Sequence, residues 1–339
     1  MFQAVSVSVL SFCCFLPLQE NESDYKIQGE YSGVIEVVAE QKIGLQVIAL
    51  GKGKFSAKLF RDGLPGDGWN QKDSLTIDER EINDGVLVFT NDVGANIAIK
   101  DGVATVSKDD EVVGSLQRVV RESPTLGEQA PEGAVVLFGD GKDKESMMQF
   151  AKLWKTKKNE SGNISDEGWL MQGVTSKQTF GDHKIHIEFQ LPFQPGKRGQ
   201  ARGNSGLYLQ GRYEVQMLDS FGLTGEQNEC GGIYSIRKPD FNMCFPPLQW
   251  QTYDIEFYQA KYDGDRVVKS AMMTVKHNGV VVHDKVELPK TTTAAPKKMD
   301  SAPGPVYLQD HGNPVRYRNI WVMPLQEQAT EGQAKPDGV

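Results

Sequence analysis

Short runs of alternating or continuous apolar residues, separated by glycine-rich turns, fill the first part of the chain. Successive side chains of a β-strand point to opposite faces, so runs of this kind predict strands. The sequences Asn83-Asp84-Gly85 and Lys100-Asp101-Gly102 are typical of tight hairpin turns. The predicted strands cover residues 33–38, 42–50, 54–60, 86–90, 95–99 and 103–107. Residues 25–121 are therefore predicted to form a small antiparallel β domain with no helix of useful length.

A charged stretch rich in proline and glycine, residues 122–131, is predicted to link this domain to a second one at residues 132–324. The second domain opens with an apolar strand at residues 134–139, followed by a short helical or loop segment near residues 144–153. Further strands are predicted at residues 169–172, 183–191, 207–218, 251–260, 272–283 and 318–322. This alternation predicts an all-β fold, a two-sheet jelly-roll sandwich. Residues 290–305 are predicted to form a flexible lobe near one rim, and residues 325–339 a disordered tail.

The run from Leu207 to Leu218 separates polar from apolar side chains by parity, as one or two strands with a buried face would. The polar positions are Gln210, Arg212, Glu214 and Gln216, and the apolar positions are Tyr213, Val215 and Met217. A cation, a carboxylate and two amides on one face can form bidentate hydrogen bonds with a polyol. The pattern therefore favours a polyol-binding sheet face over an ordinary solvated face, which is the alternative.

The composition excludes some partners. The 339 residues carry a formal net charge of −8, and binding to nucleic acid by general electrostatics requires clustered lysine and arginine. No nucleic-acid partner is therefore expected. The apolar run over the first 18 residues predicts a signal peptide within residues 1–20, although a basic start and a cleavage motif are missing. The alternative is a misassigned start or a frayed tail. We expect a protein exported to the periplasm or the extracellular space, with no membrane span in the mature chain.

Two of the four cysteines lie in the predicted signal peptide, which leaves Cys230 and Cys244. An isolated pair that closes a short loop in an exported protein predicts a disulfide. The alternative is two buried free thiols. No C-x-x-C motif or second Cys/His pair accompanies them, so zinc is not expected.

Several short motifs, in order and spacing, resemble one known family. They are Asn204-Ser205-Gly206, residues 211–216, Leu218-Asp219-Ser220, residues 230–234, residues 250–255, His311-Gly312 and residues 318–320. Together they are similar to the central signature of the 3-keto-disaccharide hydrolase domain family, over about residues 132–324. The resemblance implies a concanavalin-like jelly roll and action on 3-keto-glycosides.

Cleavage of a 3-keto-glycoside by elimination requires a base at the acidified C2 proton, an acid at the leaving oxygen, and a donor to the ketone. Direct displacement would instead require two carboxylates. We predict three catalytic candidates: Glu214, on the polar face; His311, whose imidazole can donate or accept a proton; and Glu188, whose parity could place it on the face of Glu214. Each could instead be structural: Glu214 in a pair with Arg212, His311 at the surface, and Glu188 on a solvated edge strand.

Six further residues are predicted to contact the substrate: Asn204, Arg212, Gln216, Asp219, Trp250 and Gln309. Asn204 could equally serve its own turn, and Trp250 could be a core residue rather than a ring that stacks on a sugar. Glutamate, aspartate, glutamine and histidine can all bind divalent ions, but no spacing specifies a metal site, so no metal or other cofactor is predicted.

Three functional hypotheses remain open at this stage. The first is cleavage of the glycosidic bond of 3-keto-glycosides by acid/base chemistry on a concave sheet face. The second is a non-catalytic extracytoplasmic carbohydrate-binding protein, because fold does not fix function. The third is a structural or adhesion protein in which the first domain carries the function.

Overall fold

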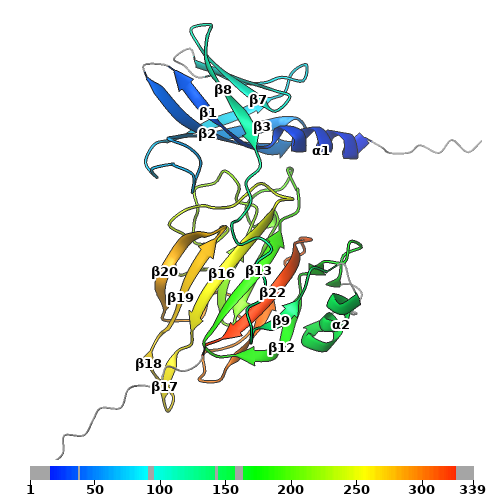
Figure 1. The fold of residues 1–339 in the computed structure, drawn as a ribbon, viewed down its shortest axis with the longest axis vertical. Helices are drawn as coiled ribbons and strands as arrows, with labels where there is room; N and C mark the ends of the chain where they lie inside the picture. The colour runs from blue at the N-terminus through cyan, green and yellow to red at the C-terminus, as the bar shows by residue number, and fades with distance from the viewer. Residues whose placement is uncertain (1–15, 37–38, 91–94, 142–143, 157–162, 326–339) are drawn as a thin grey trace, which may run out of the picture.

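The computed structural model describes residues 16–36, 39–90, 95–141, 144–156 and 163–325, and strands dominate these residues (Figure 1). The predicted all-β class is confirmed. The first 15 residues of the predicted signal peptide and the predicted tail from residue 326 lie outside the described residues, so export stays a prediction. Among the described helices, none has the length and apolar character needed to cross a membrane.

The small domain is one antiparallel sheet of eight strands in the order β4-β3-β2-β1-β8-β7-β6-β5. The strands are β1 Gly29–Glu36, β2 Glu40–Gly51, β3 Lys54–Arg61, β4 Ser74–Glu81, β5 Leu87–Thr90, β6 Ala95–Lys100, β7 Val103–Lys108 and β8 Glu111–Val119. Strands β4 and β5 are consecutive in sequence yet stand at the two ends of the sheet, and the turn at Asp84-Gly85 joins them, both residues having positive φ. The sheet must therefore curl on itself, which gives the domain its own apolar core.

Helix α1, Leu16–Ile27, precedes this sheet and was not predicted from the sequence. Its residues show no apolar stripe of helical spacing, so the sequence gives no periodic signal for it. Tertiary contacts hold its end: the Asp24 carboxylate accepts a hydrogen bond from the Gly53 amide at 3.2 Å, and the Gln28 side-chain oxygen accepts one from the Ala49 amide at 2.9 Å.

The second domain is a sandwich of two antiparallel sheets. The five-stranded sheet runs in the order β10 Trp154–Thr156, β12 Val174–Phe180, β21 Gly304–Leu308, β14 Ser205–Leu209 and β15 Tyr213–Met217. The seven-stranded sheet contains β9 Val135–Phe138, β11 Leu170–Met171, β22 Arg316–Pro324, β13 His183–Gln190, β16 Trp250–Tyr258, β19 Ala271–His277 and β20 Val280–Leu288. Of the two conformations predicted for residues 144–153, helix or loop, the structure has the helix, α2 Lys144–Leu153. A small hairpin, β17 Lys261–Asp263 and β18 Arg266–Lys269, lies apart from both sheets.

The polar and apolar parity of the run from Leu207 to Leu218 is preserved, but the run forms two strands rather than one. Gln210, Gly211 and Arg212 form the turn between β14 and β15, and Gln210 and Gly211 have positive φ, 52° and 64°. This turn sets the register that places Tyr208 opposite Glu214. Tyr213, Val215 and Met217 belong to the core between the two sheets, as their parity predicts.

The segment between the two domains is not a loose linker. Residues 123–128, which we call the strap, lie on the outer face of the seven-stranded sheet. The Ser123 hydroxyl lies 2.6 Å from the Thr252 hydroxyl, and the Thr125 hydroxyl donates to Asp254 Oδ2 at 2.7 Å. The Gly127 amide donates to Glu188 Oε1 at 2.6 Å. The strap therefore buries polar side chains of the sheet that would otherwise face solvent.

Further contacts join the small domain to one end of the sandwich (Figure 1). Arg202 donates to the Ala49 carbonyl at 3.1 Å, and Arg198 donates to the Leu50 carbonyl at 2.9 Å. Ile48 of the small domain is buried within the core cluster of the sandwich. Apolar packing therefore accompanies the hydrogen bonds at this junction, while each domain keeps a core of its own.

The structure corrects the predicted disulfide, because Cys230 and Cys244 are both free, buried thiols. Each packs in the core of the sandwich as a small apolar residue, and each has an oxygen neighbour: Cys230 Sγ lies 3.2 Å from the Tyr253 hydroxyl, and Cys244 Sγ lies 3.5 Å from the Leu218 carbonyl. Burial and these contacts satisfy the thiols without a covalent bond.

We therefore expect a thiol reagent to label neither cysteine in the native protein, because the reagent must reach a buried sulfur. In denaturant without reductant, both should become labelled. Mass spectrometry of the labelled peptides measures this directly, and an unfolded, unreduced chain with no label at Cys230 or Cys244 would show that the two sulfurs are bonded after all.

Candidate active site

Glu214 lies in the middle of β15, on the face of the five-stranded sheet that points away from the core. Its side chain is nevertheless only 2% exposed. The Tyr208 hydroxyl, on the facing strand β14, donates a hydrogen bond to Glu214 Oε2 at 2.7 Å. Burial raises the pKa of Glu214 and the Tyr208 hydrogen bond lowers it, so that the pKa is about 7 instead of 4.5. A carboxyl group of this kind can take up or release a proton near neutral pH.

Two further residues shape the surroundings of this carboxyl group. Gln309 donates from Nε2 to the Tyr208 hydroxyl at 3.3 Å, which links β21 to the Glu214–Tyr208 pair. Gly206 leaves room for the carboxyl group, because a Cβ at this position would lie 2.0 Å from Glu214 Oε1. The absence of a side chain at residue 206 is therefore a condition for the observed position of Glu214.

Three amide side chains cluster beside Glu214. Gln216 Nε2 donates to Gln200 Oε1 at 3.1 Å, and Asn204 Nδ2 donates to the same oxygen at 3.0 Å. The side-chain oxygen of Gln216 is buried and has no hydrogen-bond partner among the described residues. Buried acceptors are rarely left without a donor, so this oxygen is a candidate to accept a hydrogen bond from a molecule outside the chain.

His311 lies at the surface, next to this amide cluster. It lines a cavity of about 480 Å³ together with Gln200, on the loop that follows β21. Since Gln200 also contacts Gln216 and Asn204, the cavity and the buried amides share a wall. Gln309, two residues before His311 in the chain, reaches the Glu214–Tyr208 pair.

Two loops pair with the free edge of β15 at Glu214. The amide of Tyr234 donates to the Glu214 carbonyl at 3.1 Å, and the amide of Glu214 donates to the Thr292 hydroxyl at 3.0 Å. The loops meet where the Ser235 and Thr293 hydroxyls lie 2.6 Å apart. The loops therefore satisfy the backbone of Glu214, and they bring the Thr293 carbonyl, which accepts from the Tyr208 hydroxyl at 3.4 Å, next to the Glu214–Tyr208 pair.

With this geometry in hand, comparison with known families gives a clear match. Residues 133–323, more than half of the chain, match the 3-keto-alpha-glucoside-1,2-lyase-like domain. The chain belongs to this family. The resemblance seen in the sequence motifs is thereby confirmed.

One solved structure agrees with this family at a TM-score above 0.5, whereas no curated protein matches the chain. A protein from Parabacteroides distasonis assigned as a glycosyl hydrolase is 33% identical, with 58% of this chain and 85% of its own covered, at a TM-score of 0.51. A second protein of that organism with the same assignment is 17% identical, with 61% and 99% covered, at a TM-score of 0.38. The sandwich thus has a glycosyl hydrolase-like fold.

Arg212 is held away from the amide cluster of this lyase-like domain. Its guanidinium donates to the carbonyls of Lys298 and Ala302, at 2.8 and 3.0 Å, and pairs with Asp300. Because these bonds use Nε and both terminal nitrogens, Arg212 fixes the loop at residues 298–302. The predicted lobe at residues 290–305 is therefore tied to the sheet next to β15.

Asp219 and Trp250 also have structural partners. Asp219 Oδ2 accepts a hydrogen bond from Arg202 Nε at 2.6 Å, and Arg202 in turn contacts the small domain. Trp250 belongs to the seven-stranded sheet, where the Arg318 guanidinium lies 4.1 Å from its ring centroid and the Trp169 ring packs edge-on at 5.3 Å. Among the described side chains, no hydrogen bond, ion pair or ring contact joins either residue to Glu214.

Glu188 lies on a different sheet from Glu214, so the prediction of a shared sheet face is wrong. Parity does place Glu188 on the outer face of β13, but there the strap covers it, and Arg318 Nε donates to its Oε2 at 2.6 Å. Burial raises the pKa of Glu188, and hydrogen bonds from His186, Asn319, Gly127 and Arg318 outweigh it and lower the pKa to about 2. Glu188 is thus a permanently charged anchor at neutral pH.

Next to this anchor, the ligand atoms of Glu128, His186 and Asp254 lie within 4.8 Å of one another. His186 Nδ1 is 2.6 Å from Asp254 Oδ1. Burial lowers the pKa of His186, but its bonds to Asp254 and Glu188 raise it further, to about 9. With its imidazole protonated, His186 forms an ion-pair cluster with Asp254 and Glu188 at neutral pH.

Two residues of the site, Tyr208 and Gln200, were missed in the sequence. Tyr208 could have been found from a three-residue turn at Gln210-Gly211-Arg212, since such a turn places residue 208 opposite residue 214. Gln200 lies in the short helix Gly199–Ala201, and no sequence signal points to it.

Proposed function

We propose that this protein cleaves the glycosidic bond of 3-keto-glycosides, with Glu214 as the base and His311 as the acid. The family match and the glycosyl hydrolase-like fold support a carbohydrate substrate. The observation that carries the proposal is Glu214 itself, a carboxyl group with a pKa of about 7. It faces away from the core and lies beside a cluster of amides that can bind hydroxyl groups.

The ketone at C3 makes the C2 proton acidic, and the Glu214 carboxylate removes it. Electrons from the C2–H bond form a C1=C2 double bond while the C1–O bond breaks, and His311 donates a proton to the leaving oxygen. Water then adds across the double bond, with its hydroxyl at C1 and a proton at C2, which completes a net hydrolysis. Glu214 ends protonated and His311 ends deprotonated, so proton exchange with solvent returns each group to its starting state.

The neighbouring residues fit supporting roles in this scheme. Tyr208 stays protonated, because burial and the Glu214 charge raise its pKa, and its hydrogen bond holds the carboxylate in place. The unpaired oxygen of Gln216 can accept a bond from a sugar hydroxyl. Gln309 steadies Tyr208 through its own hydrogen bond.

The test compares two p-nitrophenyl glucosides that differ only in oxidation at C3. We expect release of p-nitrophenol from the 3-keto compound and none from the unoxidised one, because only the ketone acidifies C2. In deuterated water, elimination followed by addition should leave deuterium at C2 of the sugar. Release from the unoxidised glucoside at an equal rate, without deuterium uptake, would contradict the mechanism and indicate direct displacement.

The non-catalytic alternative makes a different prediction for the same experiment. A carbohydrate-binding protein would bind the 3-keto-glucoside, as calorimetry would detect, and would leave the aglycone attached. Binding without any release of p-nitrophenol would favour that alternative.

A further inference from the structure

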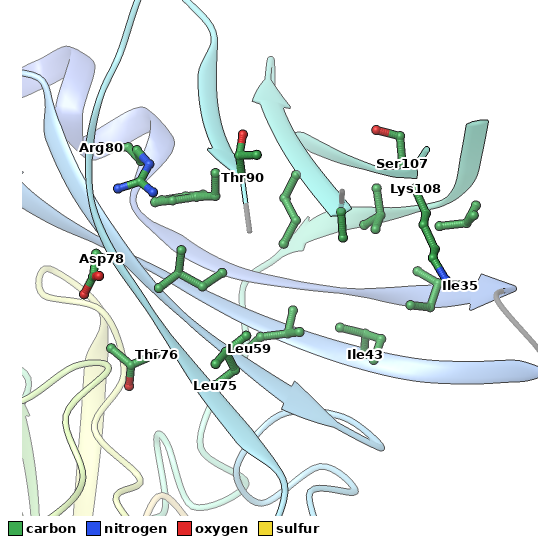
Figure 2. A pocket seen from close by; sticks show the side chains of 16 residues that line it. Ile35, Ile43, Leu59, Leu75, Thr76, Asp78, Arg80, Thr90, Ser107 and Lys108 are labelled. Carbon is green, nitrogen blue, oxygen red and sulfur yellow. The ribbon is translucent and has the colours of Figure 1, made fainter. Parts of the chain in front are cut away.

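The small β domain contains a cavity of about 350 Å³ in the interior of its curled sheet (Figure 2). Every one of the eight strands contributes to the lining, and most of the contributing residues lie toward one end of the domain, although those of β4 extend along the strand as far as Arg80. They include Ile35 at the end of β1, Ile43 at the start of β2, Leu75 at the start of β4 and Phe89 near the end of β5. The cavity is therefore the mouth of an incompletely closed barrel, a place where small molecules bind in other folds.

The gap in the barrel explains why the cavity opens. Next to the turn, the amides and carbonyls of Asn83 and Val86 exchange hydrogen bonds at 3.0 and 2.9 Å. Beyond this point the described parts of β4 and β5 form no ladder, although they stand at the two ends of one sheet. Strands β4 and β5 are therefore joined by hydrogen bonds at the turn and are unpaired at their other ends, where the cavity opens.

The walls of the cavity are apolar. Ten of the lining residues are aliphatic or aromatic: Ile35, Ile43, Leu59, Leu75, Ile77, Phe89, Ala95, Ile97, Val106 and Val113. Leu75 is 51% exposed, so part of this apolar surface meets solvent. Its volume falls within the range of about 300–1,000 Å³ that small-molecule sites occupy. An aliphatic chain would gain about fourfold in affinity for each methylene group buried there.

The rim of the cavity is polar and carries more positive than negative charge. Arg80 and Lys108 lie on it, with Asp78 as the one acidic residue of the lining. Figure 2 shows Arg80 and Asp78 on one side and Lys108 on the other. Within the described residues, neither cation forms an ion pair, whereas the whole chain has a net charge of −8. Two cations against one carboxylate in the lining favour an anionic head group.

We propose that the small β domain binds a free amphiphile with one aliphatic chain and an anionic head group. The chain occupies the apolar cavity, and the head group stays at the rim that carries Arg80 and Lys108. This site belongs to the small domain alone, so it is independent of the chemistry proposed for Glu214.

The first test is calorimetry of the full chain with dodecanoate, kept below the concentration at which it forms micelles. We expect saturable binding of one molecule, weaker for octanoate by about fourfold for each methylene removed. Dodecyltrimethylammonium, which has the same chain and a positive head, should bind at least fivefold more weakly. Lys108→Gln and Arg80→Gln should each weaken dodecanoate two- to fivefold, and Lys100→Gln, outside the cavity, should not.

Two variants that fill the cavity give the structural test. Ile77→Trp and Leu75→Trp should each weaken dodecanoate at least tenfold, because an indole would occupy the space of the chain. The control Val88→Trp places the same group on the opposite face of β5, where Val88 is 41% exposed, and should bind like the parent.

The proposal is overturned if dodecanoate shows no saturable binding to the parent. It is equally overturned if both cavity variants fold, by their thermal midpoints, and bind dodecanoate as the parent does. Binding to phosphatidylglycerol vesicles without binding to free dodecanoate would also overturn it, because it would identify a membrane surface as the partner.

Discussion

Replacing Glu214 with glutamine is expected to lower kcat for the 3-keto-glucoside by about a hundredfold or more. Glutamine keeps the size of the side chain and an oxygen that can accept the Tyr208 hydrogen bond, but it cannot take up the C2 proton. The measurement is the initial rate of p-nitrophenol release at saturating substrate. Glu287→Gln, an exposed glutamate on β20 of the same domain, is the matched control and should keep the parental rate.

The pH profile sharpens this expectation. As a base, Glu214 must be ionised, so kcat/KM should rise with pH through about 7, the pKa of this carboxyl group. Tyr208→Phe removes the hydrogen bond that lowers this pKa, so the rise should move to higher pH. A Glu214→Gln enzyme with the parental rate, or a Tyr208→Phe profile that does not move, would rule out Glu214 as the base.

Glu214→Gln, which should lower the rate, should raise the stability of the fold. The pKa of Glu214 is raised from 4.5 to about 7 on folding, so ionisation opposes folding and stability falls as pH rises from 4.5 through 7. Above pH 7, Glu214→Gln should therefore be more stable than the parent by up to about 3 kcal/mol. Loss of rate together with gain of stability would mark Glu214 as a functional residue.

Replacing Glu188 with alanine is expected to destabilise the fold by about 3–5 kcal/mol, the usual cost of removing one partner of a buried ion pair. The change leaves the Gly127 amide and the charges of Arg318 and His186 without their acceptor. Urea denaturation at pH 6 measures the loss. Glu256→Ala is the matched control, since its pair with Lys184 is exposed and should contribute less than about 1 kcal/mol.

The pH dependence of stability gives an independent check. The pKa of Glu188 is lowered to about 2, so its contribution is complete above 4.5 and is lost as pH falls from 4.5 through 2. The pKa of His186 is raised to about 9, so its contribution is complete below 6.5 and is lost as pH rises from 6.5 through 9. The acid loss should vanish in Glu188→Ala. If a folded Glu188→Ala protein had a kcat a hundredfold lower than the parent, Glu188 would have a catalytic role after all.

Parity predicted the side of each strand well and could not predict which sheet the strand joins. The alternation at Tyr213, Val215 and Met217 located the core face, and the same reasoning put Glu188 on an outer face. A two-residue period, however, is a property of one strand, whereas the choice of sheet depends on partners far away in the chain. Glu188 and Glu214 were therefore placed together although β13 and β15 lie in opposite layers.

The contact partners of the candidate binding residues could not be predicted from the sequence either. Trp250 packs against Arg318, and Arg212 binds the carbonyls of Lys298 and Ala302. Such contacts join residues that are distant in sequence, and no local pattern encodes them. The sequence signal for Glu214 was stronger because the alternation along β15 separates it and Gln216 from the core residues, and because the family motifs include it.

The strap has a consequence for how this protein can be divided or recombined. The family match begins at residue 133, but the sandwich takes hydrogen bonds from Ser123, Thr125 and Gly127, which precede that point. A lyase-like domain severed at the boundary of its sequence family would thus lose part of its own surface. When the sandwich is transferred to another protein, in evolution or by design, its surface stays complete only if the strap is included, whatever domain precedes it.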